Sequence, residues 1–277
     1  MGKNIIITGA SDGIGAAAAR QLVGAGHTVV IVGRSAEKTR AVAEELGSDY
    51  FVADYSRLAD VRALAADLTA AYPRIDVLAN NAGGMFGDRE PTVDGFEKTL
   101  QVNHLAPFLL TNLLMPTLVH SGARVIQTSS DAARISGKLN LSDLANDTKY
   151  SAMKAYGDAK LENILFTTEL HERYFDRGLT ATAFHPGTVS SNFASGSASA
   201  LARFVYNGPA RRLMTTPESA AAQLVWLATA PTEDLTSGGY YEKRKLAKKV
   251  HPQIRDRQLA RSLWTLSSEL VGLPVSA

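Results

Sequence analysis

Short apolar segments alternate along this chain with longer segments rich in Ala and Leu, and this alternation restricts the fold more than any other feature. Helical stretches separate seven segments that have the length and composition of strands, namely Asn4–Thr8, Thr28–Val32, Tyr50–Ala53, Val77–Ala79, Arg124–Thr128, Leu179–Phe184 and Gly239–Tyr241. Repeated strand-helix units place parallel strands in one sheet with helices on both faces. We therefore predict an α/β fold with a doubly wound parallel sheet of about seven strands flanked by helices.

The size and composition of the chain predict one domain. With 277 residues, of which 45% are apolar, the chain can bury one sizeable core. We expect residues 1–277 to form a single domain, with a mobile substrate-loop excursion at 192–216, where Ser, Ala, Gly and Arg are frequent, and a C-terminal extension at 240–277 packed on the domain. Apolar residues recur at helical spacing between Gln253 and Leu270, which predicts an amphipathic helix there. Another helix is expected from Pro217 to Ala228, capped by Thr216.

Composition also excludes several kinds of site and partner. There are no cysteines, which excludes thiolate catalysis and Cys-ligated zinc and makes the cytoplasm the expected location. The apolar run near the N-terminus is too short for a signal peptide, and no run reaches the roughly 18 residues of a membrane span. The net charge of +2 gives no reason to expect nucleic acid. Two basic clusters, Arg211-Arg212 and the five cations of Lys243–Lys249, are interpreted as solvated surface, with an anionic surface or partner as the alternative.

A glycine-rich turn follows the first predicted strand directly. The sequence from Thr8 to Gly15 is Thr-Gly-Ala-Ser-Asp-Gly-Ile-Gly, and an Ala-rich helix begins after it. Glycines permit a tight turn and let backbone N–H groups approach a pyrophosphate, while the helix N-terminus favours the anion. At this first strand-to-helix junction, the turn indicates a dinucleotide site in a Rossmann-type sheet rather than a purely structural turn, with contacts from Gly9, Ser11, Asp12, Gly13, Ile14 and Gly15.

The end of the second predicted strand indicates which dinucleotide binds. NAD-specific sites place a carboxylate there for the ribose 2′-hydroxyl, but here Gly33-Arg34-Ser35 follows the strand, with no acid before Glu37. A guanidinium pairs well with a 2′-phosphate through charge-assisted hydrogen bonds. We therefore predict NADP(H) in preference to NAD(H), with Arg34 at the phosphate. The alternative is that Arg34 is a solvated loop residue.

Further motifs follow the glycine turn in a fixed order. They are Asn80-Asn81-Ala82-Gly83, Val102-Asn103-His104-Leu105, Ser129-Ser130, Tyr156-Gly157-Asp158-Ala159-Lys160 and His185-Pro186-Gly187. Together with the turn, this set resembles the short-chain dehydrogenase/reductase (SDR) family. The segments Phe108-Leu109-Leu110-Thr111 and Lys160-Leu161-Glu162-Asn163 are similar to those of its retinol-dehydrogenase-like branch. The resemblance covers nearly the whole chain, and six motifs in the family's order make it specific.

The resemblance implies an oxidoreductase that transfers a hydride between a nicotinamide and a carbonyl or alcohol carbon. In the family's mechanism a Tyr is the acid/base, a Lys lowers its pKa and binds the nicotinamide ribose, a Ser hydrogen-bonds the substrate oxygen, and an Asn holds a water of a proton relay. Those residues match Tyr156, Lys160, Ser130 and Asn103 here, while Ser129 matches the strand end. A phenol, with an ordinary pKa of about 10, needs such a neighbouring cation to exchange protons near neutral pH.

The acid/base pair requires a choice between two matches. Tyr150 and Lys154 have the same spacing as Tyr156 and Lys160. However, Tyr156 lies 30 residues before Pro186 and Tyr150 lies 36 residues before it, and the shorter separation resembles the family's. We therefore assign Tyr156 and Lys160, and interpret Tyr150 as a residue near the helix start that borders the site.

The resemblance implies further cofactor contacts. These are Asp54 and Tyr55 at the adenine, Asn80 and Ala82 at the adenosine ribose, Gly83 for close approach, the Pro186-Gly187 turn, and Val189 and Ser191 at the carboxamide or pyrophosphate. No metal site is predicted, because no third ligand with suitable spacing accompanies His104 and His185.

The expected substrate is a lipophilic aldehyde, ketone or alcohol. The predicted pocket walls, Met85-Phe86, Asp131–Asn140 and Phe193–Met214, are mostly apolar. Asp131 and Ala133 depart from residues common in the retinol-dehydrogenase-like branch, so the substrate class is kept broader than retinoids. A C=C double-bond reductase of the same family and an NADP(H)-binding regulator without turnover are the alternatives, and the four intact catalytic residues disfavour the regulator. A homo-oligomer is compatible with the sequence.

Overall fold

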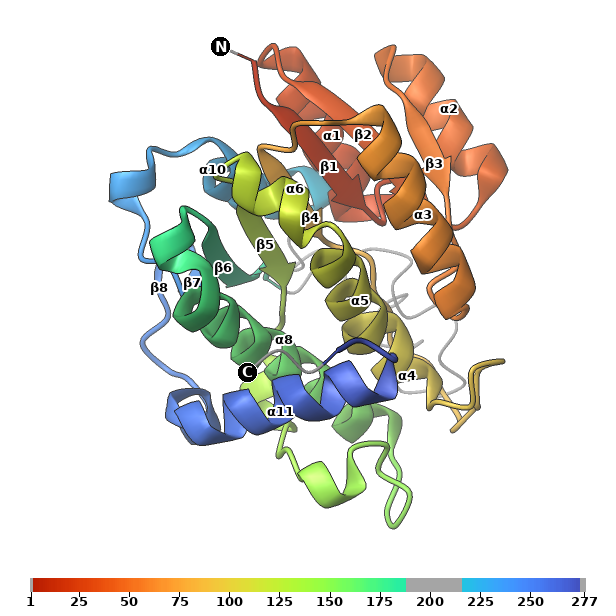
Figure 1. Ribbon diagram of the computed structural model, residues 1–277, viewed down its shortest axis with the longest axis vertical. Helices are drawn as coiled ribbons and strands as arrows, with labels where there is room; N and C mark the ends of the chain where they lie inside the picture. Colours follow the sequence, from red (N-terminus) through yellow and green to blue (C-terminus); the bar gives the residue numbers. More distant parts are fainter. Residues whose placement is uncertain (1, 188–215, 275–277) are drawn as a thin grey trace.

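The computed structural model of the protein describes residues 2–187 and 216–274, whose helices surround an eight-stranded sheet (Figure 1). The strand order is β3-β2-β1-β4-β5-β6-β7-β8, and only the β7–β8 pair is antiparallel. The strands are β1 (Asn4–Thr8), β2 (Thr28–Gly33), β3 (Tyr50–Val52), β4 (Val77–Asn80), β5 (Arg124–Thr128), β6 (Thr180–His185), β7 (Gly239–Glu242) and β8 (Lys245–Leu246).

The predicted Rossmann-type sheet is confirmed, and its strands agree with the expected segments to within one residue at each end. The prediction holds because strands covered by helices on both faces are nearly continuous apolar runs. Residues Ile5 to Ile7, for example, are at most 1% exposed. The expected number of about seven strands omitted β8, because a two-residue strand of Lys245 and Leu246 has no apolar pattern to reveal it.

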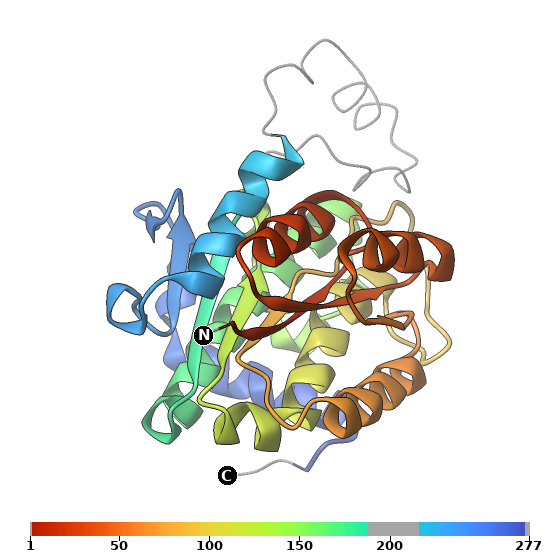
Figure 2. The same ribbon diagram turned by 90° about the horizontal axis from the view of Figure 1, so that it is seen from above.

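Helices cover both faces of the sheet, as Figure 2 shows. One face packs against α1, α2 and α10, and the other against α3, α5, α8 and α11. The helices are α1 (Gly13–Gly24), α2 (Ala36–Leu46), α3 (Leu58–Ala71), α4 (Lys98–Leu100), the π-helix η1 (Gln101–Leu105), α5 (Ala106–Leu113), α6 (Met115–His120), α7 (Ala132–Ile135), α8 (Ala152–Tyr174), α10 (Pro217–Thr229) and α11 (Arg257–Leu270). Short 3-10 turns lie at Leu141–Asp143, Phe175–Arg177, Thr232–Asp234 and Pro252–Arg255.

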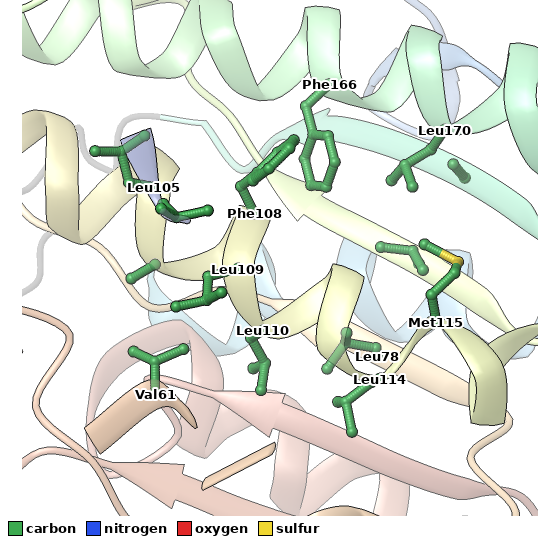
Figure 3. Packing of buried hydrophobic residues seen from close by; sticks show 14 of the residues in the cluster. Val61, Leu78, Leu105, Phe108, Leu109, Leu110, Leu114, Met115, Phe166 and Leu170 are labelled. Atoms are coloured by element: carbon green, nitrogen blue, oxygen red, sulfur yellow. The ribbon is translucent and has the colours of Figure 1, made fainter. Parts of the chain in front are cut away.

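The C-terminal helix completes the larger of two apolar clusters. Figure 3 shows the centre of this cluster, where Phe108 of α5 faces Phe166 of α8. Their ring centroids are 5.0 Å apart, and the indole of Trp264 from α11 lies 5.1 Å from Phe108 and 5.6 Å from Phe166. An imidazole nitrogen of His104 lies 2.8 Å from the hydroxyl of Ser267, which ties α11 to η1.

Two predicted segments differ in detail from the structure. The helix expected between Gln253 and Leu270 is interrupted, because the Asp256 carboxylate accepts a hydrogen bond from the Leu259 N–H and so begins α11 at Arg257. The extension expected at 240–277 begins inside the sheet, since Tyr240 belongs to β7. The predicted cap of α10 is confirmed by Thr216, whose hydroxyl accepts from the Ser219 N–H. The rest of the excursion at 192–216 lies outside the described residues.

The topology gathers the predicted site residues at one edge of the sheet. Strand order reverses between β1 and β4, and in open parallel sheets ligands bind beyond the carboxyl ends of the strands at such a switch point. The glycine turn follows β1, Asn81 follows β4, Ser129 follows β5, and His185 ends β6. In the two described stretches, no helix combines the length and hydropathy needed to cross a membrane.

Candidate active site

Neighbouring backbone atoms lie so close to the glycine turn that there is no room in it for side chains. Gly9 and Gly13 have φ angles of +66° and +54°, which non-glycine residues rarely adopt. A Cβ on Gly9 would lie 2.7 Å from the Cα of Ala82, and a Cβ on Gly15 would lie 2.4 Å from the Gly9 carbonyl oxygen. The turn therefore depends on glycine at these positions, as its sequence predicted.

Hydrogen bonds of Thr8, at the end of β1, and of Asn81 hold the loop after β4 against this turn. The Thr8 hydroxyl accepts from the N–H groups of Asn81 (3.1 Å) and Ala82 (3.0 Å). The Asn81 side-chain amide donates to the carbonyls of Thr8 (3.0 Å) and Gly9 (3.3 Å). The side chain of Asn80, which is expected at the adenosine ribose, donates to the Thr111 hydroxyl at 2.8 Å and is buried. Asn81 lies just past the end of β4, so the alternation of strand faces did not reveal that its side chain contacts the turn.

The start of α1 has the properties of an anion site. The Asp12 carboxylate caps the helix by accepting from the Gly13 N–H at 2.7 Å, while the N–H groups of Ile14 and Gly15 belong to the first turn and have no partner within the helix. The Lys38 ammonium lies 3.6 Å from the Asp12 carboxylate and offsets its charge. A cradle without side chains beside a helix N-terminus fits a dinucleotide pyrophosphate.

The region predicted to bind the adenosine half of the cofactor carries exposed basic side chains. Arg34 follows β2 directly, is exposed, and lies four positions before Lys38 in the sequence. Asp54 follows β3, and one of its carboxylate oxygens accepts from the N–H (2.9 Å) and hydroxyl (2.8 Å) of Ser56. The Tyr55 side chain is buried in the core at 5% exposure, so only its backbone lies at this edge.

Helix α8 brings Tyr156 and Lys160 together. The Lys160 ammonium lies 5.5 Å from the centroid of the Tyr156 ring and donates to the Thr128 carbonyl at 3.1 Å. Lys160 is only 2% exposed, and this burial lowers the pKa of its ammonium to about 7. A Cβ on Gly83 would lie 3.1 Å from the ammonium, so the absence of a side chain at residue 83 leaves the space before Lys160 open.

The competing pair is arranged differently. Lys154 forms an ion pair with Asp158 and donates to the Lys138 carbonyl at 3.2 Å. The Tyr150 hydroxyl donates to the buried carboxylate of Glu97 at 3.3 Å, and burial raises the pKa of this phenol. Lys154 is thus held by an acid of its own helix, whereas Lys160 lies against a tyrosine.

The two adjacent serines have separate surroundings. Ser129 is 1% exposed and its hydroxyl donates to the Lys160 carbonyl at 2.7 Å, which fixes the end of β5 to α8. Ser130 is partly exposed, and its hydroxyl oxygen accepts from the Ala132 N–H at 3.2 Å. The Ser130 hydroxyl therefore keeps its own proton available for a bond toward the open edge of the sheet.

Asn103 is fully buried in the π-helix η1, a feature that sequence reasoning missed. Its amide donates to the carbonyls of Gly84 (2.8 Å) and Thr99 (2.9 Å) and accepts from the Gly84 N–H (3.1 Å). The Ala106 N–H reaches back five residues to the Gln101 carbonyl. Such a bulge frees backbone groups from the α-helical pattern and is frequent at functional sites. Propensity does not distinguish a π-turn from an α-turn, so no sequence signal revealed it.

The remaining predicted residues lie at the rim of the site or in the core. The N–H of Asp131 donates to the His185 imidazole at 3.2 Å, and Arg134 binds the Asp131 carboxylate at 2.8 Å. Pro186 and Gly187 follow, the latter with a φ of +92°. His104 is a core residue, and burial lowers its pKa to about 4. Val189, Ser191 and the wall Phe193–Met214 lie outside the described residues, and no cluster of metal-ligating side chains was found in the part described.

Comparison with known proteins places this arrangement in a family. Residues 3–201 match the family described as short chain dehydrogenase. The protein is a short-chain dehydrogenase. This dehydrogenase is 44% identical, over 98% of its own chain and 93% of the relative, to a Streptomyces sp. (strain C5) protein, DnrU, whose name assigns it daunorubicin C-13 ketoreductase activity. It is 35% identical to Homo sapiens retinol dehydrogenase 13, over 98% of its own chain and 85% of the relative.

Solved structures agree with these sequence relatives. The short-chain dehydrogenase superposes with a TM-score of 0.79 on an uncharacterized protein from Mycobacterium Paratuberculosis, 31% identical over 99% of this chain and 95% of that one. The TM-score is 0.68 for a short chain dehydrogenase from Escherichia coli CFT073 complexed with NADPH, which is 26% identical over 86% of this chain and 95% of that one. The predicted retinol-dehydrogenase-like family is confirmed, and the protein is an NAD(P)-dependent oxidoreductase.

Proposed function

We propose that this short-chain dehydrogenase interconverts a lipophilic ketone or aldehyde and its alcohol, with NADP(H) in preference to NAD(H). The observation that carries the proposal is the buried ammonium of Lys160, 5.5 Å from the ring centroid of Tyr156. Ser130 lies two residues after the end of the neighbouring strand β5 and is partly exposed. When a carbonyl is reduced, its oxygen gains negative charge and needs a proton donor and hydrogen bonds. The phenol, the cation and the hydroxyl at this edge of the sheet can supply them.

Each of these residues has a distinct task. Tyr156 donates a proton to the alkoxide oxygen, or takes one from the alcohol in the reverse direction. The ammonium of Lys160 favours the phenolate form of Tyr156 by charge attraction. The Ser130 hydroxyl donates a hydrogen bond to the reacting oxygen, and the Asn103 segment holds a water that returns the proton toward Lys160.

The cofactor would be held by residues that fit it. The glycine turn and the N-terminus of α1 suit the pyrophosphate, Asp54 and the Ala82-Gly83 segment suit the adenosine, and Lys160 suits the nicotinamide ribose. When bound, the nicotinamide supplies or accepts the hydride. A 2′-phosphate would meet Arg34, with Lys38 on the first turns of α2 as a second cation nearby and no acid on β2 to repel it. The related Escherichia coli enzyme was solved with NADPH.

The names of the relatives narrow the substrate. DnrU is named as a C-13 ketoreductase of daunorubicin, and the retinol dehydrogenases are named for retinol. The rim of this site carries the Asp131–Arg134 ion pair, with both side chains 40% exposed, so an otherwise apolar pocket has a polar border. Bulky aromatic ketones are therefore the first substrates to test, with retinaldehyde second.

The decisive experiment removes the proposed acid. Tyr156→Phe should lower kcat for ketone reduction by roughly 10²- to 10⁴-fold while leaving NADPH binding nearly unchanged, measured by NADPH oxidation and by a binding titration. Tyr150→Phe is the matched comparison and should keep most of the activity. Loss of activity in Tyr150→Phe with retention in Tyr156→Phe would reverse the assignment. Product analysis distinguishes an alcohol from the product of C=C reduction.

A further inference from the structure

The hairpin of β7 and β8 carries a cluster of exposed cations, of which Lys245 is opposite Glu242 in the register of the two strands. Five of the seven residues from Lys243 to Lys249 are Lys or Arg, and all five are exposed. None of them forms an ion pair with a carboxylate in the described stretches, although eleven ion pairs exist elsewhere on these residues. We call this segment the basic hairpin. Because the whole chain has a net charge of only +2, this charge is concentrated locally and is not a general property of the surface.

The turn of the basic hairpin places two of its cations in a costly conformation. Lys243 and Arg244 have φ angles of +51° and +61°, the conformation that two-residue hairpin turns require and that Asn-Gly adopts readily. A non-glycine residue in this region costs on the order of 1–3 kcal/mol. The turn would fold more easily with Asn-Gly, and the only hydrogen bond of either side chain in the described residues is a long one, 3.4 Å, from the Arg244 guanidinium to the Ala222 carbonyl, so contacts within the fold account for little of this choice of residues.

The basic hairpin lies at the same edge of the sheet as the candidate active site. Glu242, which precedes the turn, is paired in register with His185 at the carboxyl end of β6. The His185 imidazole in turn accepts from the Asp131 N–H, next to Ser130. Figure 2 shows the hairpin projecting from the margin of the molecule, beyond the last parallel strand. Whatever binds the cations is therefore close to the mouth of the site.

Apolar side chains accompany the cations. Leu246 lies between Lys245 and Lys248 in the sequence and is 49% exposed, and Ile135 of the neighbouring helix α7 is 69% exposed. Asp131, which directly precedes α7, donates its N–H to His185, the register partner of Glu242, so α7 begins near the strand end that leads into the hairpin. Protection of an edge strand against pairing needs only a charge or two and disfavours exposed leucine. A basic surface with exposed apolar side chains is instead typical of binding at a lipid interface.

We propose that the basic hairpin docks this protein on a lipid bilayer whose headgroups carry negative charge. Four of its five cations are lysines, which act as hydrated point charges suited to a diffuse anionic surface, whereas arginine is preferred for bidentate recognition of phosphate in nucleic acids. Clusters of four to eight Lys or Arg residues beside a membrane helix or on an amphipathic helix are a signature of binding to anionic lipid, and the basic hairpin presents five such cations from a β-turn instead. Docking brings the mouth of the site toward a reservoir of lipophilic substrate, a consequence that rests on the proposed function.

Vesicle sedimentation tests the docking without using turnover. The full chain should sediment with vesicles of phosphatidylcholine containing phosphatidylserine and not with phosphatidylcholine alone, and binding should weaken as salt rises. The variant Lys243→Asn/Arg244→Gly keeps the hairpin turn and should unfold no earlier than the parent. Its partition onto the anionic vesicles should fall roughly thirty-fold, because each of the two cations near such a surface contributes about 1 kcal/mol.

A matched control removes two cations from the opposite edge of the sheet. Arg74 and Arg177 precede β4 and β6 and are exposed, so Arg74→Gln/Arg177→Gln should bind vesicles like the parent. Equal sedimentation with both kinds of vesicle, unchanged binding by the Asn-Gly variant, or binding to RNA or polyglutamate without binding to vesicles would each overturn the proposal. None of these results bears on Tyr156 or on ketone reduction, so the two proposals fail separately.

Discussion

A carboxylic acid without a partner lies under the candidate site. Glu162 of α8 is fully buried, and neither of its carboxyl oxygens has a hydrogen-bond partner among the residues described. Removal from water raises its pKa well above the ordinary carboxyl value, the nearby carboxylates of Asp158 and Glu97 raise it further, and the ammonium of Lys154 opposes them. Glu162 therefore keeps its proton in the folded protein at pH values where the unfolded chain has lost it.

This difference predicts a pH-dependent stability. Above the ordinary carboxyl pKa the unfolded state binds fewer protons than the folded state, so the Glu162 contribution to the free energy of unfolding decreases as pH rises toward its folded pKa. Glu162→Gln removes the titration. The variant should match the parent near pH 5 and exceed it near pH 8 by about 1 kcal/mol or more, since each pKa unit corresponds to about 1.4 kcal/mol.

Denaturant unfolding at the two pH values measures the effect. Glu45→Gln is a suitable comparison, because Glu45 is exposed and bonded to Arg20. If the difference in free energy of unfolding between Glu162→Gln and the parent stays constant with pH, Glu162 does not titrate as described.

At the residue scale, the sequence predicted which groups gather but not their orientation. It selected Tyr156, Lys160 and Ser130, and the structure brings the first two into contact. It gave no role to Asn81, whose side chain donates to the carbonyl of Gly9 in the glycine turn. Nor did it show that the Tyr55 ring is buried. Asn81 and Tyr55 lie just beyond the ends of β4 and β3, where the alternation of strand faces no longer gives the direction of a side chain.

At the element scale, long buried strands and capped helices were predictable and local irregularities were not. The β1 and β5 segments were predicted without error, because their apolar runs have clear limits. The π-helix η1 and the two-residue strand β8 were missed. Both depend on tertiary packing: η1 adapts a helix to its neighbours, and β8 exists only because the hairpin turn folds back onto β7.

The glycines of α1 provide a test at this scale. Gly15→Ala should weaken NADPH binding at least ten-fold, because its Cβ would lie 2.4 Å from the Gly9 carbonyl oxygen and displace the turn. Gly24→Ala, at the other end of the same helix, has no atom within 4 Å of its Cβ and should stabilise the protein by about 0.5–1 kcal/mol. A fluorescence titration with NADPH and a denaturation curve measure the two effects. Equal binding by both variants would remove the glycine turn from the cofactor site.

At the scale of the whole molecule, cofactor binding should raise the free energy of unfolding of the protein. A ligand that binds only the folded state at about 100 times its Kd raises the free energy of unfolding by about 2.7 kcal/mol. We expect NADPH to produce this increase at a concentration where NADH produces a smaller one. In Arg34→Ala the difference between the two nucleotides should nearly vanish, because the proposed phosphate partner is gone. An equal increase from both nucleotides in the parent would contradict the preference for NADP(H).

The position of α11 at the end of the chain affects how the protein folds during its synthesis. Trp264 lies 156 residues after Phe108, yet the two rings pack together in the core. During synthesis, the apolar sides of α5 and α8 leave the ribosome well before the helix that covers them. The nascent chain therefore passes through a stage with an uncovered apolar seam, the kind of surface that chaperones shield and that otherwise aggregates. Shortened chains that stop before Arg257 would remain at that stage.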